Sequence, residues 1–316
     1  GLANGSVLTS DTLWQLPAPP RRLGIIGGGA IGVEMAQIFH DLGAEVRLLD
    51  RAERILGEVD SEIVTQLLKA WEEEAPRLQR VNGAQISALR GAPGAATLHY
   101  QDSDGVAHAF ACDYILLATG KRPRLEPLRL ELAGVERDAA AIRVDPQCRT
   151  SVPHIYAVGD VIGGYMLAHT ASQQGRIAAD AILGGTMRYA EEKDCGVIFS
   201  RPEAAFAGRS LAQAKAAGID AVEAKLPIQL DAMAMIHGER HGLIKLVAER
   251  ASERIIGVHL LAEQADSLIG EAVLMVSGEM TLSQVADAIH PHPTQTELFS
   301  DLARRLRARL RRSQRR

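Results

Sequence analysis

The first fifty residues carry apolar runs in the order strand, turn, helix, strand. Residues 23–26 form a short apolar run that leads into a glycine-rich segment at 27–32. Apolar residues then recur at helical spacing, and a second apolar run at 45–49 ends on Asp50. This order predicts a βαβ unit over residues 21–50.

Further elements follow along the first two thirds of the chain. Helices are expected where apolar residues line one face, and strands where apolar and polar residues alternate between glycine-rich breaks. The expected elements are a helix at 60–74, strand runs at 84–111 with a loop at 91–94 and a hairpin turn at 102–105, buried strands at 114–120 and 155–160, and a helix at 167–183. Residues 1–20 look like an extended, proline-rich lead-in without a strand of its own.

Residues 191–316 differ in character and predict a separate α+β domain. Ser210 is expected to cap a helix with Gln213 at the capping-box position, and Thr281 and Gln284 repeat this pattern. The other expected elements are a strand-like stretch at 191–208, strands at 223–228, 242–248 and 254–261, and helices at 263–277 and 282–288. The fold class is therefore α/β, with a Rossmann-like domain first and an α+β domain last.

The composition is that of an ordinary globular chain. Of 316 residues, 47% are hydrophobic and 23% charged, and the net charge is −4, so we expect two or three domains and no nucleic-acid partner. No run is apolar enough to span a bilayer and no secretory signal opens the chain, which favours a cytoplasmic protein with no membrane partner. Cys112, Cys148 and Cys195 form no close pair, so neither a metal site nor a local redox disulfide is expected.

The last fifteen residues, 302–316, are rich in arginine. Leu302, Leu306 and Leu310 recur there at i, i+4 spacing, which is typical of a helix. A basic helix end either contacts RNA or a membrane, or is a solvated terminus whose cations interact favourably with the helix dipole. The second interpretation is preferred.

The glycine-rich segment fits a dinucleotide-binding fingerprint. Gly27, Gly29 and Gly32 stand at the three glycine positions of G-x-G-x-x-G. There they permit a tight turn, a close approach of pyrophosphate to the backbone, and packing of the helix on the strand. The expected cofactor contacts of this segment are Gly27, Gly28, Gly29, Ala30, Ile31, Gly32 and Val33.

Asp50 bears on the choice of cofactor. It lies about 20 residues beyond the fingerprint, where a carboxylate accepts hydrogen bonds from both ribose hydroxyls and repels a 2′-phosphate. NAD is therefore expected over NADP, although the neighbouring Arg51 and Arg54 are candidates for binding a 2′-phosphate.

Five motifs in order make the chain resemble the class I pyridine nucleotide–disulfide oxidoreductases, which are flavoproteins, and among them most closely the dihydrolipoamide dehydrogenases. They are GGGAIGVE at 27–34, ATGKRP at 118–123, YAVGD at 156–160, MLAH at 166–169 and HPHPTQTE at 290–297. Members of this family begin with an FAD-binding unit that has its own glycine fingerprint and a C-x4-C redox disulfide, and neither motif is found in this sequence.

The resemblance implies a domain order. Residues 1–120 would form the NAD-binding domain, 121–190 the returning segment of the FAD-binding domain, and 191–316 the dimerisation domain with its basic tail. The chain would then be a fragment or one half of a split enzyme, inactive until an N-terminal FAD-binding segment is supplied.

The resemblance also assigns roles to residues outside the fingerprint. Glu34 would lie near the nicotinamide, the alternative being an ordinary acid in the first turn of a helix. Asp160 would bond the ribityl chain of FAD, the alternative being a turn-forming residue. The remaining expected cofactor contacts are Gly120 and the flavin-facing helix start at Met166, Leu167, Ala168 and His169.

His292 and Glu297 match the family's acid–base pair. A histidine titrates near neutrality, and a carboxylate fixes its tautomer, which suits a base that holds the proton of an attacking dithiol. The alternatives are a loop histidine and a capping-box glutamate paired with Thr294. In relatives the peptide bond between this histidine and Pro293 is cis and the histidine serves the other subunit, so a cis bond and a homodimer through residues 191–316 are expected.

The expected function is an FAD- and NAD-dependent oxidoreductase that acts on a small dithiol or lipoyl-type substrate. Two other flavoprotein types, mercuric reductase and transhydrogenase, are less favoured. The chain lacks a terminal Cys-Cys pair, and a transhydrogenase would not need His292. A catalytically inactive NAD-binding and dimerisation fragment is the alternative from a different class.

Overall fold

The computed structural model describes residues 5–314, which belong to two compact units. The first unit lies within Gly1–Gly120 and Val197–Arg316, and the second is Lys121–Gly196. No helix in the described part of the chain is long and apolar enough to cross a membrane.

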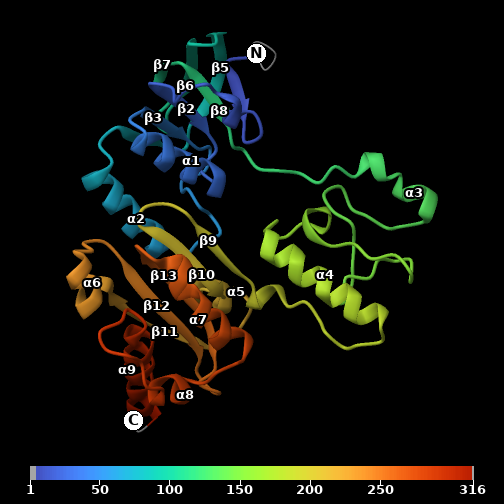
Figure 1. The fold of residues 1–316 in the computed structure, drawn as a ribbon, viewed down its shortest axis with the longest axis vertical. Coiled ribbons are helices and arrows are strands. Elements are labelled where there is room, and N and C mark those ends of the chain that lie inside the picture. The colour runs from blue at the N-terminus through green and yellow to red at the C-terminus, as the bar shows by residue number, and fades with distance from the viewer. Residues whose placement is uncertain (1–4, 315–316) are drawn as a thin grey trace. The chain divides into compact units, whose positions relative to one another are not determined.

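A five-stranded parallel sheet is the centre of the N-terminal part of the first unit, and Figure 1 shows it between α1 and a small antiparallel sheet. The strand order is β1-β8-β2-β3-β4, and the predicted βαβ unit is confirmed as β2, α1 and β3. The bounds are β1 Val7–Thr9, β2 Arg22–Ile26, α1 Ala30–Asp41, β3 Glu45–Leu49, α2 Ser61–Glu74, β4 Leu78–Val81 and β8 Tyr114–Leu117.

The prediction that residues 1–20 contain no strand is wrong. Val7–Thr9 forms β1, which pairs in parallel with β8 at the edge of the sheet. Ile115 donates its backbone N–H to Ser6 over 2.9 Å, and a short 3-10 turn at Leu13–Gln15 buries Leu13 against the core. A three-residue strand carries too little alternation to be recognised, and it forms because the edge of β8 offers unpaired backbone groups.

The three-stranded antiparallel sheet comprises β5 (Gln85–Ala92), β6 (Ala95–Gln101) and β7 (Ala107–Cys112). The break expected to be a loop at 91–94 is instead a tight hairpin turn, because Ala92 pairs directly with Ala95. The hairpin predicted at 102–105 is confirmed between β6 and β7. Phe110 of this sheet is buried in one cluster with Leu49 and Ile115 of the parallel sheet.

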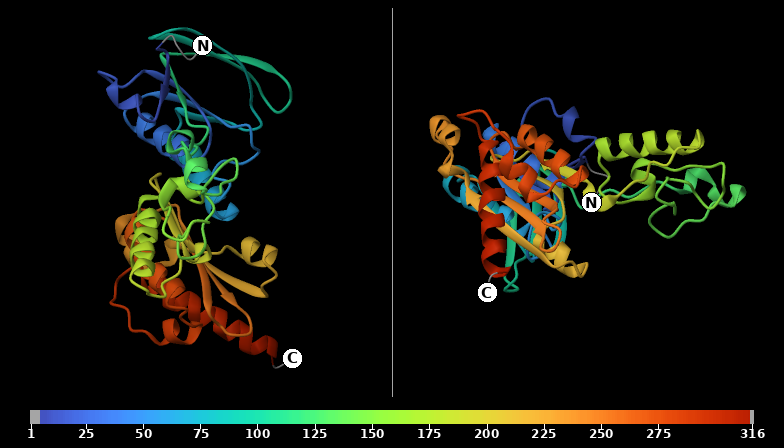
Figure 2. Two further views of the ribbon diagram at one scale, coloured as in Figure 1. Left: turned by 90° about the vertical axis from the view of Figure 1, so that its right-hand side faces the viewer. Right: turned by 90° about the horizontal axis from the view of Figure 1, so that it is seen from below.

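An antiparallel sheet ordered β11-β12-β13-β10-β9 forms the C-terminal part of the first unit, and Figure 2 shows α9 running across it. Helix α9 packs on β11 and β12, and α7 packs on β10 and β13. Both predicted capping boxes, at Ser210 and at Thr281, are confirmed. The bounds are β9 Cys195–Ile198, β10 Glu203–Gly208, α5 Leu211–Ala216, β11 Ala221–Pro227, α6 Ala232–His237, β12 Leu243–Glu249, β13 Ile255–Ala262, α7 Ala265–Ser277, α8 Leu282–Asp287 and α9 Glu297–Gln314.

The second unit contains α3 (Leu130–Ala133) and the longer helix α4 (Ala168–Ile182), the latter as predicted. The strand expected at 155–160 does not form. Tyr156 makes only an isolated bridge to Arg149, and Gly159–Ile162 is a 3-10 turn. A strand needs a neighbouring ladder for its backbone groups, and in the described part of this unit residues 155–160 take part in only that one bridge.

A buried ionic cluster joins α2 to the C-terminal sheet. The Lys245 ammonium on β12 lies 2.9 Å from both carboxylate oxygens of Asp60, and its side chain is only 5% exposed. Glu62 and Glu223 lie within 3.3 and 3.2 Å of the same ammonium. Because the sheet also contacts α2 through β13 and β10, this cluster fixes the nucleotide-fold part of the chain on the C-terminal sheet.

Candidate functional site

The glycine turn between β2 and α1 is built by close backbone approaches. Gly27 has a φ of +111°, and its N–H bonds Leu49 over 2.8 Å. A Cβ at Gly32 would lie 1.8 Å from the Gly27 carbonyl oxygen, so only glycine lets the helix pack this closely. A Cβ at Gly29, in contrast, would have no neighbour within 4 Å. The turn is therefore closed at Gly27 and Gly32 and open at Gly29.

The N-terminus of α1 offers free backbone donors to a ligand. Gly29 is the N-cap residue and supplies no side-chain hydrogen bond, and the first turn carries no acidic residue. Helix α2 makes a useful contrast, because its N-cap Asp60 accepts from the N–H groups of Glu62 and Ile63. The uncapped donors of α1 and the positive end of its dipole are the features that bind a pyrophosphate.

Asp50 closes one side of this turn. One of its carboxylate oxygens accepts from the N–H of Gly28, and the other accepts from Ala52 over 2.6 Å. Each oxygen has a second lone pair for a ribose hydroxyl. Arg54 is turned into its own loop, where it bonds the carbonyls of Val59 at 3.0 Å and Gly57 at 2.7 Å.

Glu34 links α1 to the segment between β9 and β10. Its carboxylate accepts from the Phe199 N–H over 3.0 Å, and burial raises its pKa above the usual range. The alternative of a first-turn acid is wrong, because Glu34 lies in the second turn of α1. The sequence contains no signal that pairs Glu34 with Phe199, 165 positions later.

Of the other predicted cofactor residues, Gly120 belongs to the first unit, while those at the start of α4 and in the 3-10 turn before it belong to the second unit. Leu167 is the N-cap of α4 and makes no side-chain cap, while Ala168 and His169 are exposed. Asp160 is exposed in the turn, and the preceding Gly159 donates to Gln174 of α4 over 2.8 Å. The predicted residues of this unit therefore belong to two segments that are bonded to each other.

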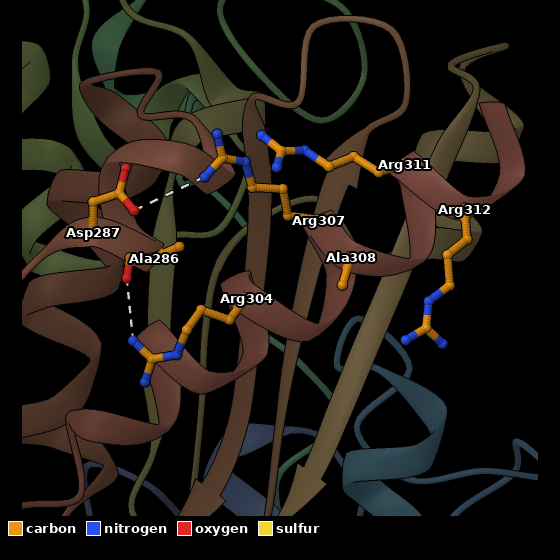
Figure 3. A pocket seen from close by; sticks show the side chains of 7 residues that line it. All are labelled: Ala286, Asp287, Arg304, Arg307, Ala308, Arg311 and Arg312. Carbon is orange, nitrogen blue, oxygen red and sulfur yellow. Dashed lines mark hydrogen bonds and ion pairs between the residues drawn. The ribbon is translucent and has the colours of Figure 1, made fainter. Parts of the chain in front are cut away.

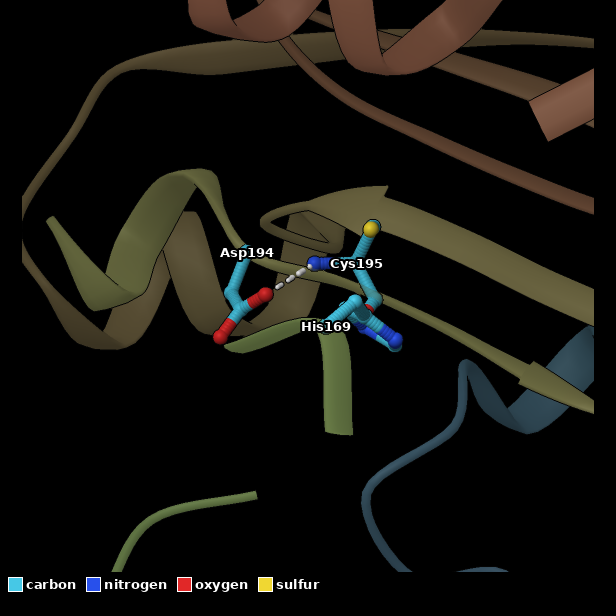
Figure 4. Close-up of side chains that lie close together, drawn as sticks. All are labelled: His169, Asp194 and Cys195. Carbon is cyan, nitrogen blue, oxygen red and sulfur yellow. Dashed lines mark hydrogen bonds between the residues drawn. The ribbon is translucent and has the colours of Figure 1, made fainter. Parts of the chain in front are cut away.

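His169, Asp194 and Cys195 lie together in the second unit, and each has one possible ligand atom within 4.8 Å of the others (Figure 4). No metal site was expected here. Asp194 accepts from Thr170 and Tyr189, both at 2.8 Å, and from the Cys195 N–H. Burial and Asp194 together raise the pKa of Tyr189 and of the Cys195 thiol. The Asp194 carboxylate is therefore engaged in hydrogen bonds, and the one from Thr170 anchors the start of α4.

His292 stands exposed in the loop before α9, and the geometry expected for it is confirmed. The His292–Pro293 peptide bond is cis, and Nδ1 of the ring lies 3.1 Å from each carboxylate oxygen of Glu297. Glu297 also accepts from the Thr294 N–H over 2.9 Å. This N–H and the imidazole lower the pKa of Glu297.

The capping-box alternative for Glu297 is only half realised. Glu297 bonds the Thr294 N–H, but the Thr294 hydroxyl donates to the Pro291 carbonyl over 2.7 Å. His290, the other histidine of the motif, bonds Glu271 over 2.8 Å and its side chain is 8% exposed, against 73% for His292. His292 is therefore the histidine of this motif with a ring open to solvent.

Comparison with known proteins identifies both parts of the chain. Residues 1–175 match the family model described as pyridine nucleotide-disulphide oxidoreductase, and residues 195–303 match the dimerisation domain of that family. A dihydrolipoyl dehydrogenase of Bacillus subtilis is 35% identical over 94% of this chain, and one of Chlamydia pneumoniae is 33% identical over 93%. The chain spans about 63% of the length of these relatives.

Solved structures agree with this assignment. LpdA from Mycobacterium tuberculosis matches with a TM-score of 0.86 at 26% identity, over 95% of this chain and 64% of that one. RclA from Escherichia coli, a flavoprotein disulfide reductase induced by HOCl, matches with a TM-score of 0.83 at 26% identity, over 95% of this chain and 68% of that one. With its Rossmann-like part and its antiparallel C-terminal sheet, the chain belongs to the pyridine nucleotide-disulphide oxidoreductase family.

Proposed function

We propose that the chain is part of a dihydrolipoyl dehydrogenase-like enzyme that passes electrons between NAD(H), FAD and a small dithiol. The observation that carries the proposal is the exposed His292 ring held by Glu297, in a chain whose α1 N-terminus is open to a dinucleotide. The dihydrolipoyl dehydrogenase relatives support the choice of reaction within the family.

The NAD-binding role rests on α1 and Asp50. A pyrophosphate would lie against Gly29, where no protein atom fills the space of a side chain, and would meet the uncapped N–H groups of α1. Asp50 would accept the ribose hydroxyls. Because Arg54 is occupied by the carbonyls of its own loop, only Arg51 is left beside Asp50 to favour a 2′-phosphate, which supports NAD over NADP.

Asp50→Ala is expected to weaken NADH binding to the purified chain about tenfold or more, because a hydrogen bond to a charged group contributes about 1.5–3 kcal/mol. Titration calorimetry with NADH and NADPH measures the change. Asp50→Asn, which keeps one carbonyl oxygen as an acceptor, should lose less. Tighter binding of NADPH than of NADH by the parent chain would contradict the assignment.

The family is FAD-dependent, and the residues of the second unit fit a contact with that cofactor. The uncapped N-terminus of α4, with Ala168 and His169 exposed, is an electropositive end that would stabilise negative charge on a reduced flavin. Asp160 would accept from a ribityl hydroxyl, and Met166 and Leu167 would contribute the backbone beside the ring. The flavin, when bound, supplies the hydride acceptor.

The acid–base role belongs to His292. With Nδ1 directed at Glu297, the opposite ring nitrogen Nε2 is the atom that would take the proton from a substrate thiol. The thiol S–H bond then breaks to leave a thiolate, and the imidazole becomes an imidazolium whose charge Glu297 stabilises. Since the pKa of Glu297 is lowered, the carboxylate is ionised at neutral pH and able to do this.

The C-terminal part is expected to hold two copies together. It matches the family's dimerisation domain, and Ile289, the residue before the His290 motif, is 99% exposed. Leu274 on α7 is 67% exposed, so apolar side chains are available for a self-complementary face.

Light scattering at micromolar concentration is therefore expected to give twice the 34.0 kDa of the single chain. Ile289→Arg would place a charge in the interface and shift the mass toward the monomer. Lys215→Arg, a conservative change on the surface of α5, serves as the control. A parent chain that is monomeric under these conditions would contradict dimerisation through residues 191–316.

A further inference from the structure

An arginine-lined hollow lies between the end of α8 and the C-terminal half of α9, apart from the residues of the proposed function (Figure 3). Its volume is about 340 Å³, and its walls come from Arg304, Arg307, Arg311 and Arg312 of α9 with Ala286 and Asp287 of α8. We propose that this hollow binds a small ligand that carries two or more linked phosphate groups.

The spacing along α9 creates the hollow. Arg304, Arg307 and Arg311 follow one another at i, i+3 and i+7 and so share one face of the helix. Ala308 lies on the same face, and its small side chain leaves the space between the arginines open. The opposite face of α9 is anchored, because Leu302, Leu306 and Leu310 are at most 2% exposed. The backbone that presents the arginines is therefore held in place before any ligand arrives.

Positive charge in the hollow is only partly compensated by the protein. Arg304 bonds the Ala286 carbonyl over 3.1 Å and also pairs with Asp301. Arg307 lies 3.9 Å from Asp287 and 3.7 Å from Glu253, and its Nε is buried without a hydrogen-bond partner.

In the described part of the chain, the last two arginines of the hollow make no compensating ion pair. Within residues 5–314, no carboxylate lies within ion-pair distance of Arg311 or Arg312. Like charges at i, i+4, such as Arg307 and Arg311, repel each other in the absence of an anion. The favourable interaction of cations with a helix C-terminus accounts for arginines in the last turn, but not for Arg304 and Arg307 farther up the helix.

The size and chemistry of the hollow favour linked phosphates. Guanidinium groups bind phosphate through two parallel hydrogen bonds, and several of them in a row match several phosphates. From residue 304 to residue 312 the helix rises about 12 Å, longer than one phosphate needs. A volume of about 340 Å³ is that of a small-molecule site, whereas a nucleic acid would need a longer basic surface.

Calorimetric titration of the full chain with inorganic tripolyphosphate tests the proposal. Arg311→Gln should weaken binding at least fivefold, while Arg305→Gln, which removes an equal charge from an α9 side chain that does not line the hollow, should change it less than twofold. Ala308→Leu fills the hollow without altering the charge and should also weaken binding at least fivefold. Circular dichroism checks that each variant is folded. If Ala308→Leu does not fold, the comparison of Arg311→Gln with Arg305→Gln still tests whether the hollow is the binding site.

Three further arms define the ligand and the site. Orthophosphate should bind at least tenfold more weakly than tripolyphosphate, and ATP shows whether a nucleoside on the phosphate chain adds affinity over the inorganic form. Gly29→Asp, which places a carboxylate at the open approach to α1, should abolish NADH binding and leave tripolyphosphate binding intact.

Equal losses in Arg311→Gln and Arg305→Gln, or tighter binding of single-stranded RNA than of tripolyphosphate, would overturn the proposal. A change of molar mass in Arg311→Gln would also overturn it, because the hollow would then be an interface between copies.

Discussion

His292→Gln, in a protein completed to the full length of its relatives, is expected to slow the dithiol half-reaction about a hundredfold or more. Glutamine keeps the volume and hydrogen-bonding capacity of the position but cannot take a proton at neutral pH. Transfer of hydride from NADH to the flavin should be unchanged, because the proton of the thiol is not involved in that step. Anaerobic stopped-flow absorbance, which follows the two half-reactions separately, measures both rates.

His290 supplies the matched control for this experiment. It lies two residues away but is buried and bonded to Glu271, so His290→Gln should affect stability more than the dithiol step. Glu297→Gln should shift the pH profile of the dithiol step, because the neutral amide no longer stabilises the imidazolium of His292. A dithiol step that proceeds at the parent rate in His292→Gln would refute the acid–base assignment.

Lys245→Met is expected to lower the free energy of unfolding by about 3–5 kcal/mol, since removing one partner of a buried ion pair leaves the other charge unpaired. The charge left behind is Asp60, whose side chain is 7% exposed and which would then lie beside the carboxylates of Glu62 and Glu223 without the ammonium that all three share. Urea unfolding followed by tryptophan fluorescence reports on this region, because Trp71 is buried in α2.

Two variants distinguish the cost of leaving a buried carboxylate unpaired from the cost of removing a lysine charge in general. Lys225→Met removes a half-exposed ammonium that pairs with Glu62 and should cost at most about 1 kcal/mol. Adding Asp60→Asn to Lys245→Met should recover part of the loss, because the unpaired carboxylate is gone while the amide oxygen still caps α2. A double variant no more stable than the single one would show that packing, and not charge, sets the cost.

The effect of Lys245→Met should also depend on pH. Burial alone would raise the pKa of Asp60, but the hydrogen bonds and charge of Lys245 more than offset it, and the pKa lies below its usual value. Stability from this carboxylate is therefore present above about pH 4, the ordinary value, and is lost as pH falls through the lower folded value. The pKa of Lys245 is raised in spite of burial, so its contribution is lost only above about pH 10. The cost of the substitution should be greatest between these limits.

Local sequence patterns were enough to predict the features whose contacts are made by residues close together in the sequence. The turn at Gly27 and Gly32 demands glycine because a Cβ has no room there, so its spacing in the sequence identifies it. The capping boxes at Ser210 and Thr281 are likewise made by residues three apart. The pair of His292 with Glu297 was expected from a motif of eight residues, and the structure brings the two side chains together.

Features made by distant segments were missed or predicted wrongly. Strand β1 exists because β8 has an open edge, and residues 155–160 form no strand because the described part of their unit gives them no ladder. The bond from Phe199 to Glu34 spans 165 positions and leaves no periodic signal in the sequence. The same holds for the pair of Lys245 with Asp60, which are 185 positions apart.

The arginine-rich end of the chain shows what the sequence pattern determines and what the tertiary structure adds. The leucine spacing determined that residues 302–310 lie on a helix with one buried face. Only the tertiary structure placed the end of α8 beside that helix and so turned a basic face into a hollow. The physical reason is general: hydrogen bonds and periodicity within a segment are encoded by neighbouring residues, whereas burial, charge pairing and concavity depend on which distant segments come to lie together.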